Sequence, residues 1–249
     1  MPITNTNMPI TITNMPITIT NVVNVFVRNC KTYLNDRYRS YEHCRKCFLD
    51  NKYFPAKYDL ITLHLYAYLA SWGMLRNSFL LHKDYLFNKP VVEILCKPEY
   101  DCLKYFDPFG PNAKYYLGRI MKLKEEISDY YNGKTYIIKP KTGNNKTIVK
   151  TINKVSDTLV SKIILGTLGC IPAYDQFFIK GLKKYNEDYK LEPKIMRRFR
   201  KDSLEKLIDF AKANKIEIED ACNKLNNACG VKGLYTPMKV IDMYFWELG

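Results

Sequence analysis

Apolar residues recur at spacings of three and four along most of the chain, which is the pattern of helices that bury one face. The pattern starts at Val22 and returns after almost every break. It predicts helices over residues 22–34, 41–49, 59–74, 90–95, 112–131, 155–168, 175–185, 192–214, 218–228 and 237–246. No segment alternates clearly enough to predict a strand, although 136–138 has residues that could pair briefly. We therefore expect an all-α fold.

The segment 59–74 is the most apolar of these helices. The face that its spacing brings together consists of Leu60, Leu63, His64, Ala67 and Ala70. A face this broad is typical of a central, buried helix, so we expect 59–74 to lie in the middle of the fold.

Two segments interrupt the helical pattern and divide the chain. Residues 1–21 are the units MPITNTN, MPITITN and MPITITN, which carry no charge and one Pro each. Recurrent Pro and Asn discourage regular structure, so we expect a disordered arm outside the fold. Residues 134–147, rich in Lys, Asn, Thr and Gly, are the best internal boundary. The folded part, 22–249, is expected to be one domain with helical lobes at 22–133 and 148–249 and a cleft between them.

Charge points to a partner. The 39 Lys and Arg against 25 Asp and Glu give a net charge of +14, and the basic residues are spread among 20 Tyr. Nucleic acid fits this distribution better than a membrane surface does. The alternative is an AT-rich genome, which favours Lys, Asn, Tyr and Ile codons. No apolar run approaches the ~20 residues of a membrane span, so we expect a soluble, monomeric, cytoplasmic protein.

The eight cysteines favour neither disulfides nor a metal centre. No secretory signal precedes them, and a chain of this length can bury a core without cross-links. His43, Cys44 and Cys47 have a zinc-like local spacing, but no second pair completes a tetrahedral site. No Gly-rich phosphate loop is present, and all three histidines lie in the first third of the chain. We expect no metal and no cofactor.

The segment 151–182, TINKVSDTLVSKIILGTLGCIPAYDQFFIKGL, carries the most specific signal. It predicts a turn, an apolar helix, a Gly/Pro break and then Asp175 at the start of another helix. An acid in that position accepts backbone N–H bonds that keep it ionised, and a short loop holds it rigidly. Asp175 is therefore either a functional acid or a helix cap alone.

This segment resembles the helix-hairpin-helix DNA glycosylases, in which a hairpin and a helix precede a Pro-containing loop that presents a catalytic Asp. Residues 155–157 align with the hairpin, and 172–175 align with the loop. The terminal helix, PMKVIDMYFWELG, also looks like the helix that closes such folds. The chain departs from the family where Ser156 and Asp157 replace glycines that let backbone amides approach a phosphate.

The resemblance implies that a base is flipped out of double-stranded DNA and that its N-glycosidic bond is hydrolysed. Asp175 would stabilise an oxocarbenium-like sugar and activate water. Relatives that also cleave the strand carry Lys where this chain has Thr158, which implies a monofunctional enzyme. Lys154 or Lys162 would become the amine nucleophile if the alignment shifts by one turn.

The remaining candidates form two groups. Phosphate contacts are assigned to Lys150, Lys154, Ser156, Lys180, Arg197 and Arg198. The base pocket is assigned to Trp72, Arg76, Tyr174, Asp242, Phe245 and Trp246. Aromatic residues beside Leu and Met on a helix are more often part of a core than of a pocket, and the basic run 194–201 is equally typical of a solvated helix face.

We therefore predict a DNA glycosylase that removes a damaged or modified base, and defence against phages with modified DNA is one role that would suit it. Two other hypotheses stay open. One is a DNA-binding protein without catalytic activity, and the other is a helical interaction protein without enzymatic activity.

Overall fold

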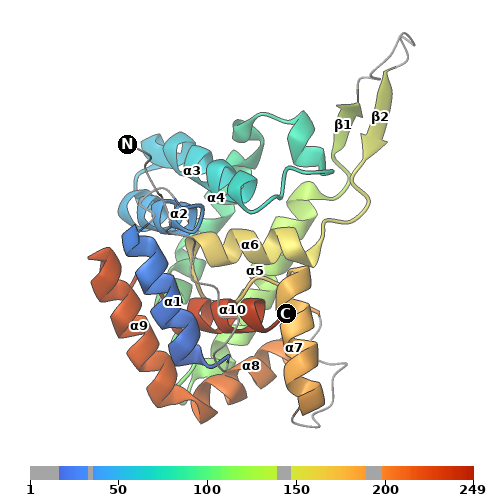
Figure 1. The fold of residues 1–249 in the computed structure, drawn as a ribbon. Coiled ribbons are helices and arrows are strands. Elements are labelled where there is room, and N and C mark those ends of the chain that lie inside the picture. The colour runs from blue at the N-terminus through green and yellow to red at the C-terminus, as the bar shows by residue number, and fades with distance from the viewer. Residues whose placement is uncertain (1–16, 33–35, 139–146, 189–197) are drawn as a thin grey trace, which may run out of the picture.

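The structure is a computed structural model that describes residues 17–32, 36–138, 147–188 and 198–249. Helices dominate it (Figure 1), which confirms the predicted all-α fold. They are α1 Ile19–Thr32, α2 Arg39–Asn51, α3 Tyr58–Ser71, α4 Lys89–Leu95, α5 Tyr116–Tyr131, α6 Asp157–Thr167, α7 Gln176–Asp188, α8 Lys201–Ala213, α9 Lys215–Cys229 and α10 Pro237–Leu248. Short 3-10 helices lie at Pro55–Lys57, Phe79–His82, Tyr85–Asn88, Pro98–Tyr105 and Ala113–Tyr115.

A small β-hairpin joins α5 to α6. Strand β1, Thr135–Ile138, pairs antiparallel with β2, Ile148–Thr151, and Ile137 lies opposite Val149. The brief pairing predicted for 136–138 is thus present, within the segment expected to be a boundary. Figure 1 shows the hairpin projecting from the helical body.

The fold begins slightly earlier than the repeat pattern predicts. Helix α1 starts at Ile19, so the last residues of the third repeat belong to it, and the Ile19 side chain is buried. The backbone N–H and the hydroxyl of Thr20 both donate to Glu217 Oε1, at 3.1 and 3.0 Å. These contacts with α9 stabilise the first turn of α1. The local sequence could not predict them, because Glu217 is distant in the chain.

The central helix is α6, and the prediction that 59–74 would occupy the middle was wrong. Every residue from Leu159 to Thr167 is buried, and α6 packs against α2, α3 and α5. Helix α3 buries Ile61, Leu65 and Leu69 and leaves Leu63 47% exposed, the reverse of the predicted face. Because α3 is apolar on nearly all sides, its periodicity could not choose the buried side.

The helix predicted over 192–214 starts later. Residues 192–197 lie outside the described ranges, residues 198–200 form a bend, and α8 begins at Lys201. Phe199 is fully buried there, and its N–H donates to Asp157 Oδ2 at 3.2 Å. Tertiary anchoring of Phe199 therefore accompanies a break in the predicted helix just before α8.

Two glycines let helices approach closely. A Cβ at Gly166 of α6 would overlap the Tyr68 ring of α3, and a Cβ at Gly181 of α7 would overlap the Phe245 carbonyl of α10. Residues on both sides of 134–147 join one buried core. The division into two lobes therefore stays a prediction. The packing of α6, α7 and α10 sets the geometry of the loop between α6 and α7.

Candidate functional site

Asp175 lies at the junction between that loop and α7. Its Oδ1 accepts hydrogen bonds from the N–H groups of Phe177 and Phe178, at 3.1 and 3.0 Å, which is an N-cap. Its Oδ2 accepts a hydrogen bond from Lys162 Nζ at 2.7 Å. Asp175 is 8% exposed. Because both carboxylate oxygens have hydrogen-bond partners, the orientation of the carboxylate is fixed.

Side chains from α6 and α10 hold the loop that presents Asp175. The N–H of Tyr174 donates to Ser161 Oγ at 2.8 Å, and Thr158 Oγ1 donates to the Tyr174 carbonyl at 2.9 Å. The N–H of Ala173 donates to Asp242 Oδ1 at 2.9 Å. Thr158 therefore has a structural partner in the residue next to Asp175.

The other end of the loop rests on a buried arginine. Arg45 of α2 is 1% exposed and donates to the Thr167 carbonyl at 2.7 Å. Gly169 follows in the left-handed region, with φ of +65°, and a Cβ there would meet the Arg45 guanidinium at 2.5 Å. Thr236 Oγ1 donates to the Gly169 carbonyl at 2.7 Å. Glycine is required here both for its backbone conformation and for its missing side chain.

A second buried ion pair lies beside the first. Lys239 Nζ donates to Asp242 Oδ2 at 2.7 Å, and both side chains are less than 10% exposed. Since Asp242 also holds Ala173, the pair ties α10 to the loop. Asp242 therefore helps to hold the loop that carries Asp175.

Both ion pairs line one pocket, which has an empty volume of about 690 Å³ counted out to its mouth. Its walls come from α1, α3, α6 and α10, from the turn at Asp36–Tyr38 and from the loop before α7. The charged residues on the walls are Asp36, Lys162, Asp175, Lys239, Asp242 and Glu247.

Three aromatic rings meet edge to face in this pocket, with interplanar angles of 66–90°. The Tyr38 and Trp72 centroids are 5.4 Å apart, those of Trp72 and Trp246 are 6.3 Å apart, and those of Tyr38 and Trp246 are 6.5 Å apart. The guanidinium carbon of Arg37 lies 5.2–5.9 Å from all three centroids. Lys162 Nζ is 5.2 Å from the Trp72 ring. Flat, π-rich walls of this kind suit a planar ligand.

Burial changes the acid–base behaviour of two groups on the walls. Desolvation raises the pKa of the Glu247 carboxyl above its ordinary value of 4.5. Desolvation also raises the pKa of the Tyr38 hydroxyl, with Arg37 acting against it. Within the described residues, no lysine or arginine forms an ion pair with Glu247, which distinguishes it from Asp175 and Asp242. Glu247 is exposed as a residue, and its carboxyl is the part that the pocket desolvates.

A wider groove adjoins the pocket. It has an empty volume of about 1,230 Å³ and is lined by residues 73–79, Tyr136, residues 151–156 and Leu159. Trp72 lines the pocket and Gly73 the groove, while Leu159 and Lys162 lie one turn apart on α6 and line groove and pocket respectively. The walls of the two hollows are therefore built from neighbouring residues of the loop after α3 and of α6.

The structure brings most of the predicted site residues into these two hollows. The pocket collects Trp72, Lys162, Asp175, Asp242 and Trp246, and the groove collects Arg76, Lys154 and Ser156.

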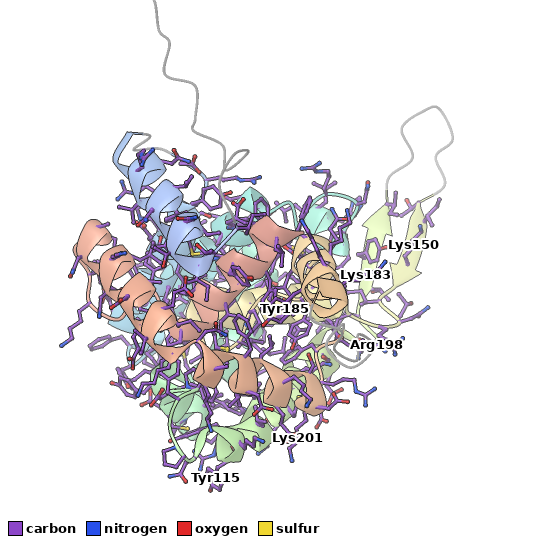
Figure 2. All side chains as sticks on the ribbon, turned by 60° about the horizontal axis from the view of Figure 1, so that its bottom comes forward. Tyr115, Lys150, Lys183, Tyr185, Arg198 and Lys201 are labelled. Carbon is purple, nitrogen blue, oxygen red and sulfur yellow. The ribbon has the colours of Figure 1, made fainter. Side chains whose placement is uncertain are left out.

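The other candidates lie elsewhere. Tyr174 and Phe245 are buried in the core, where Tyr174 stacks on Phe199 with ring centroids 5.3 Å apart. Lys150 lies on β2 and Lys180 on α7 (Lys150 is labelled in Figure 2). Arg198 is exposed, and Arg197 lies outside the described residues.

Sequence reasoning missed four contributors to the site: Tyr38, Arg45, Lys239 and Glu247. Lys239 and Glu247 lie on the same terminal helix as Asp242, and the spacing of three between Lys239 and Asp242 offered a signal for their ion pair. Tyr38 and Arg45 gave no such signal, since their partners are distant in sequence.

Metal-ligand clusters and membrane-spanning helices are absent from the described residues. In the ranges described, no three His, Cys, Asp or Glu side chains gather as metal ligands, and the cysteines at 44, 47, 96, 102, 170, 222 and 229 are free. None of the helices that the structure describes combines the length and apolar character needed to cross a membrane.

Comparison with known proteins adds no identification. The chain matches no family model, and searches of curated proteins and of solved structures gave no significant match. The resemblance to helix-hairpin-helix glycosylases consequently rests on the motif in residues 151–182 and, more weakly, on the terminal helix.

Proposed function

We propose that the pocket receives a nucleobase extruded from DNA and that Asp175 promotes hydrolysis of its N-glycosidic bond. The observation that carries the proposal is the placement of Asp175. Two backbone N–H groups and the Lys162 ammonium fix its carboxylate at the wall of a pocket built from three aromatic rings. Stacking on aromatic rings contributes roughly 1–3 kcal/mol per base and helps to offset the cost of extrusion.

The chemistry follows from the charge that develops on the sugar. As the C1′–N bond breaks, its electron pair leaves with the base and C1′ becomes positive. The Asp175 carboxylate stabilises this charge and orients a water whose oxygen bonds to C1′. The proton that this water loses is taken up by the departing base, so the hydrolysis needs no other reactant.

Lys162 serves in this proposal as a positioning residue for Asp175. An ammonium held by a carboxylate 2.7 Å away has no lone pair with which to attack C1′. Hydrolysis without strand cleavage is therefore expected. Borohydride treatment of the reacting mixture should trap no covalent protein–DNA adduct, and a trapped adduct lost in Lys162→Met would instead make Lys162 the nucleophile.

The primary test is base release from genomic DNA of varied modification status, phage DNA included, with abasic sites counted. Asp175→Asn keeps an oxygen for the helix cap but leaves the buried Lys162 ammonium without its anion, so thermal unfolding and DNA binding of this variant are measured beside base release. Loss of the negative charge should lower base release by roughly 10²–10³-fold, the range seen when one electrostatic stabiliser is removed.

Asp84→Asn is the matched control. Asp84 Oδ1 caps the 3-10 helix Tyr85–Asn88 by accepting from Phe87 N at 3.2 Å, and Asp84 lies outside both hollows. This variant should release bases like the wild type. If DNA binds but no substrate acquires abasic sites with any of the proteins, the pocket is that of a binding protein and the glycosylase proposal fails.

A further inference from the structure

The sequence around the hairpin β1–β2 is strongly cationic: residues 134–154 contain six lysines and no acid. Three of these lysines, Lys134, Lys150 and Lys154, lie in the described residues. Strands β1 and β2 project from the helical body (Figure 1), and Lys150 on β2 is exposed. A concentrated positive charge on a projecting element fits a polyanionic partner.

The two faces of the hairpin differ. Tyr136 turns toward the body, where its ring stacks on His82 with centroids 5.5 Å apart and lies 6.3 Å from Phe79. Its neighbour Ile137 is on the opposite face, paired across the strands with Val149. These two side chains are 51% and 63% exposed. One face is therefore docked, and the other presents a β-branched apolar pair to solvent.

The base of the hairpin continues into the groove beside the pocket. Tyr136 and Thr151 line the groove together with Arg76, Lys154 and Ser156. The hairpin thus leads to the groove, and residues on the wall of the groove, Gly73 and Leu159, neighbour residues on the wall of the pocket, Trp72 and Lys162.

We propose that β1–β2 is a DNA-binding arm that enters the major groove of a duplex whose neighbouring nucleotide occupies the pocket. The major groove admits a two-stranded ribbon, and apolar side chains there contact thymine methyl groups. Ile137 and Val149 supply those contacts, while Lys150 and Lys154 contact phosphates. Occupation of the pocket rests on the function proposed above, but duplex binding by the arm does not depend on catalysis.

The test measures affinity for a B-form duplex over a range of salt concentrations. Lys150→Gln/Lys154→Gln should reduce the slope of log affinity against log salt by about 1.8, since each phosphate contact contributes about 0.9. The corresponding loss of affinity is roughly 30-fold at about 0.15 M salt. The control, Lys224→Gln/Lys232→Gln, removes the same charge on and just after α9, on the side away from the hairpin in Figure 1, and should change the slope little.

A second variant tests insertion apart from charge. Ile137→Ser/Val149→Ser should keep the wild-type salt slope and weaken duplex binding at least several-fold, with single-strand binding unchanged. Equal slopes for the two lysine pairs would overturn the proposal, as would equal losses on duplex DNA, single strands and RNA. The affinity measurements are repeated in the Asp175→Asn background. If the proposed function fails but the arm binds DNA, base release is absent and the difference in salt slope between the two lysine pairs remains; if the arm does not bind DNA, that difference is absent.

Discussion

The pocket and the arm use charge in opposite ways. Four acids, Asp36, Asp175, Asp242 and Glu247, and two lysines line the pocket, whereas the sequence 134–154, which contains the arm, has six lysines and no acid. In the pocket, two lysines are buried in ion pairs whose geometry fixes a loop. On the arm, Lys150 and Lys154 are exposed. Buried charge in this chain therefore fixes the position of a loop, whereas exposed charge is available to attract a polyanionic partner.

The largest expected difference between the pocket and the arm is the effect of losing a lysine on the free energy of unfolding. Lys162→Met leaves the buried Asp175 carboxylate without its cation, and breaking a buried pair costs roughly 3–5 kcal/mol of unfolding free energy. Lys150→Met should change the same quantity by less than about 0.5 kcal/mol, because exposed substitutions have small effects. Denaturant unfolding of both variants measures the difference.

The double variant Lys162→Met/Asp175→Asn controls for lost packing. It removes both charges and should recover much of the stability lost in Lys162→Met. Equal stability of the two single variants would mean that the buried pair does not contribute to the fold.

The next prediction tests the close packing of α7 on α10, which supports the pocket. Gly181→Ala places a methyl group against the Phe245 carbonyl of α10, where backbone must shift, and overpacking of this kind costs roughly 1–3 kcal/mol or more. Gly118→Ala on α5 meets nothing within 4 Å and should instead gain about 0.5–1 kcal/mol from helix propensity. Opposite shifts in Tm are expected, and a stabilising Gly181→Ala would contradict the packing of α7 on α10.

Ser156 lies where the arm joins the central helix, and it sharpens the boundary between the two regions. Its Oγ accepts the N–H of Leu159 at 3.2 Å and caps α6. Ser156→Ala should lower stability by about 1 kcal/mol, while Ser156→Asn, which can still cap, should keep most of it. If both variants unfold alike, the cap does not stabilise α6.

The smallest effect is a pH dependence from the pocket. Burial raises the pKa of Glu247 above 4.5, so between that value and its folded pKa the folded protein binds more protons than the unfolded chain. Stability contributed by this residue therefore falls as pH rises through that window. Glu247→Gln should flatten the slope of unfolding free energy against pH from about pH 4.5 upward, and an unchanged slope would exclude this residue as its source.

The sequence predicted those features that depend on neighbouring residues. Helical periodicity located the segments that became α2, α5, α6 and α9, and the Gly/Pro break before Asp175 predicted a capped helix start. The excess of lysine was likewise visible in the composition. Local spacing is sufficient for these features because helix formation and capping are governed by residues three to four positions apart.

The tertiary structure decided which faces and which distant side chains meet. It turned α3 to bury Ile61 and Leu65, and it brought Arg45 to the loop before Asp175. It also assembled Tyr38, Trp72 and Trp246 into one pocket from three separate parts of the chain. No local rule relates such residues, because the energy that joins them comes from close packing and buried charge across the core, which exist only when the whole chain is folded.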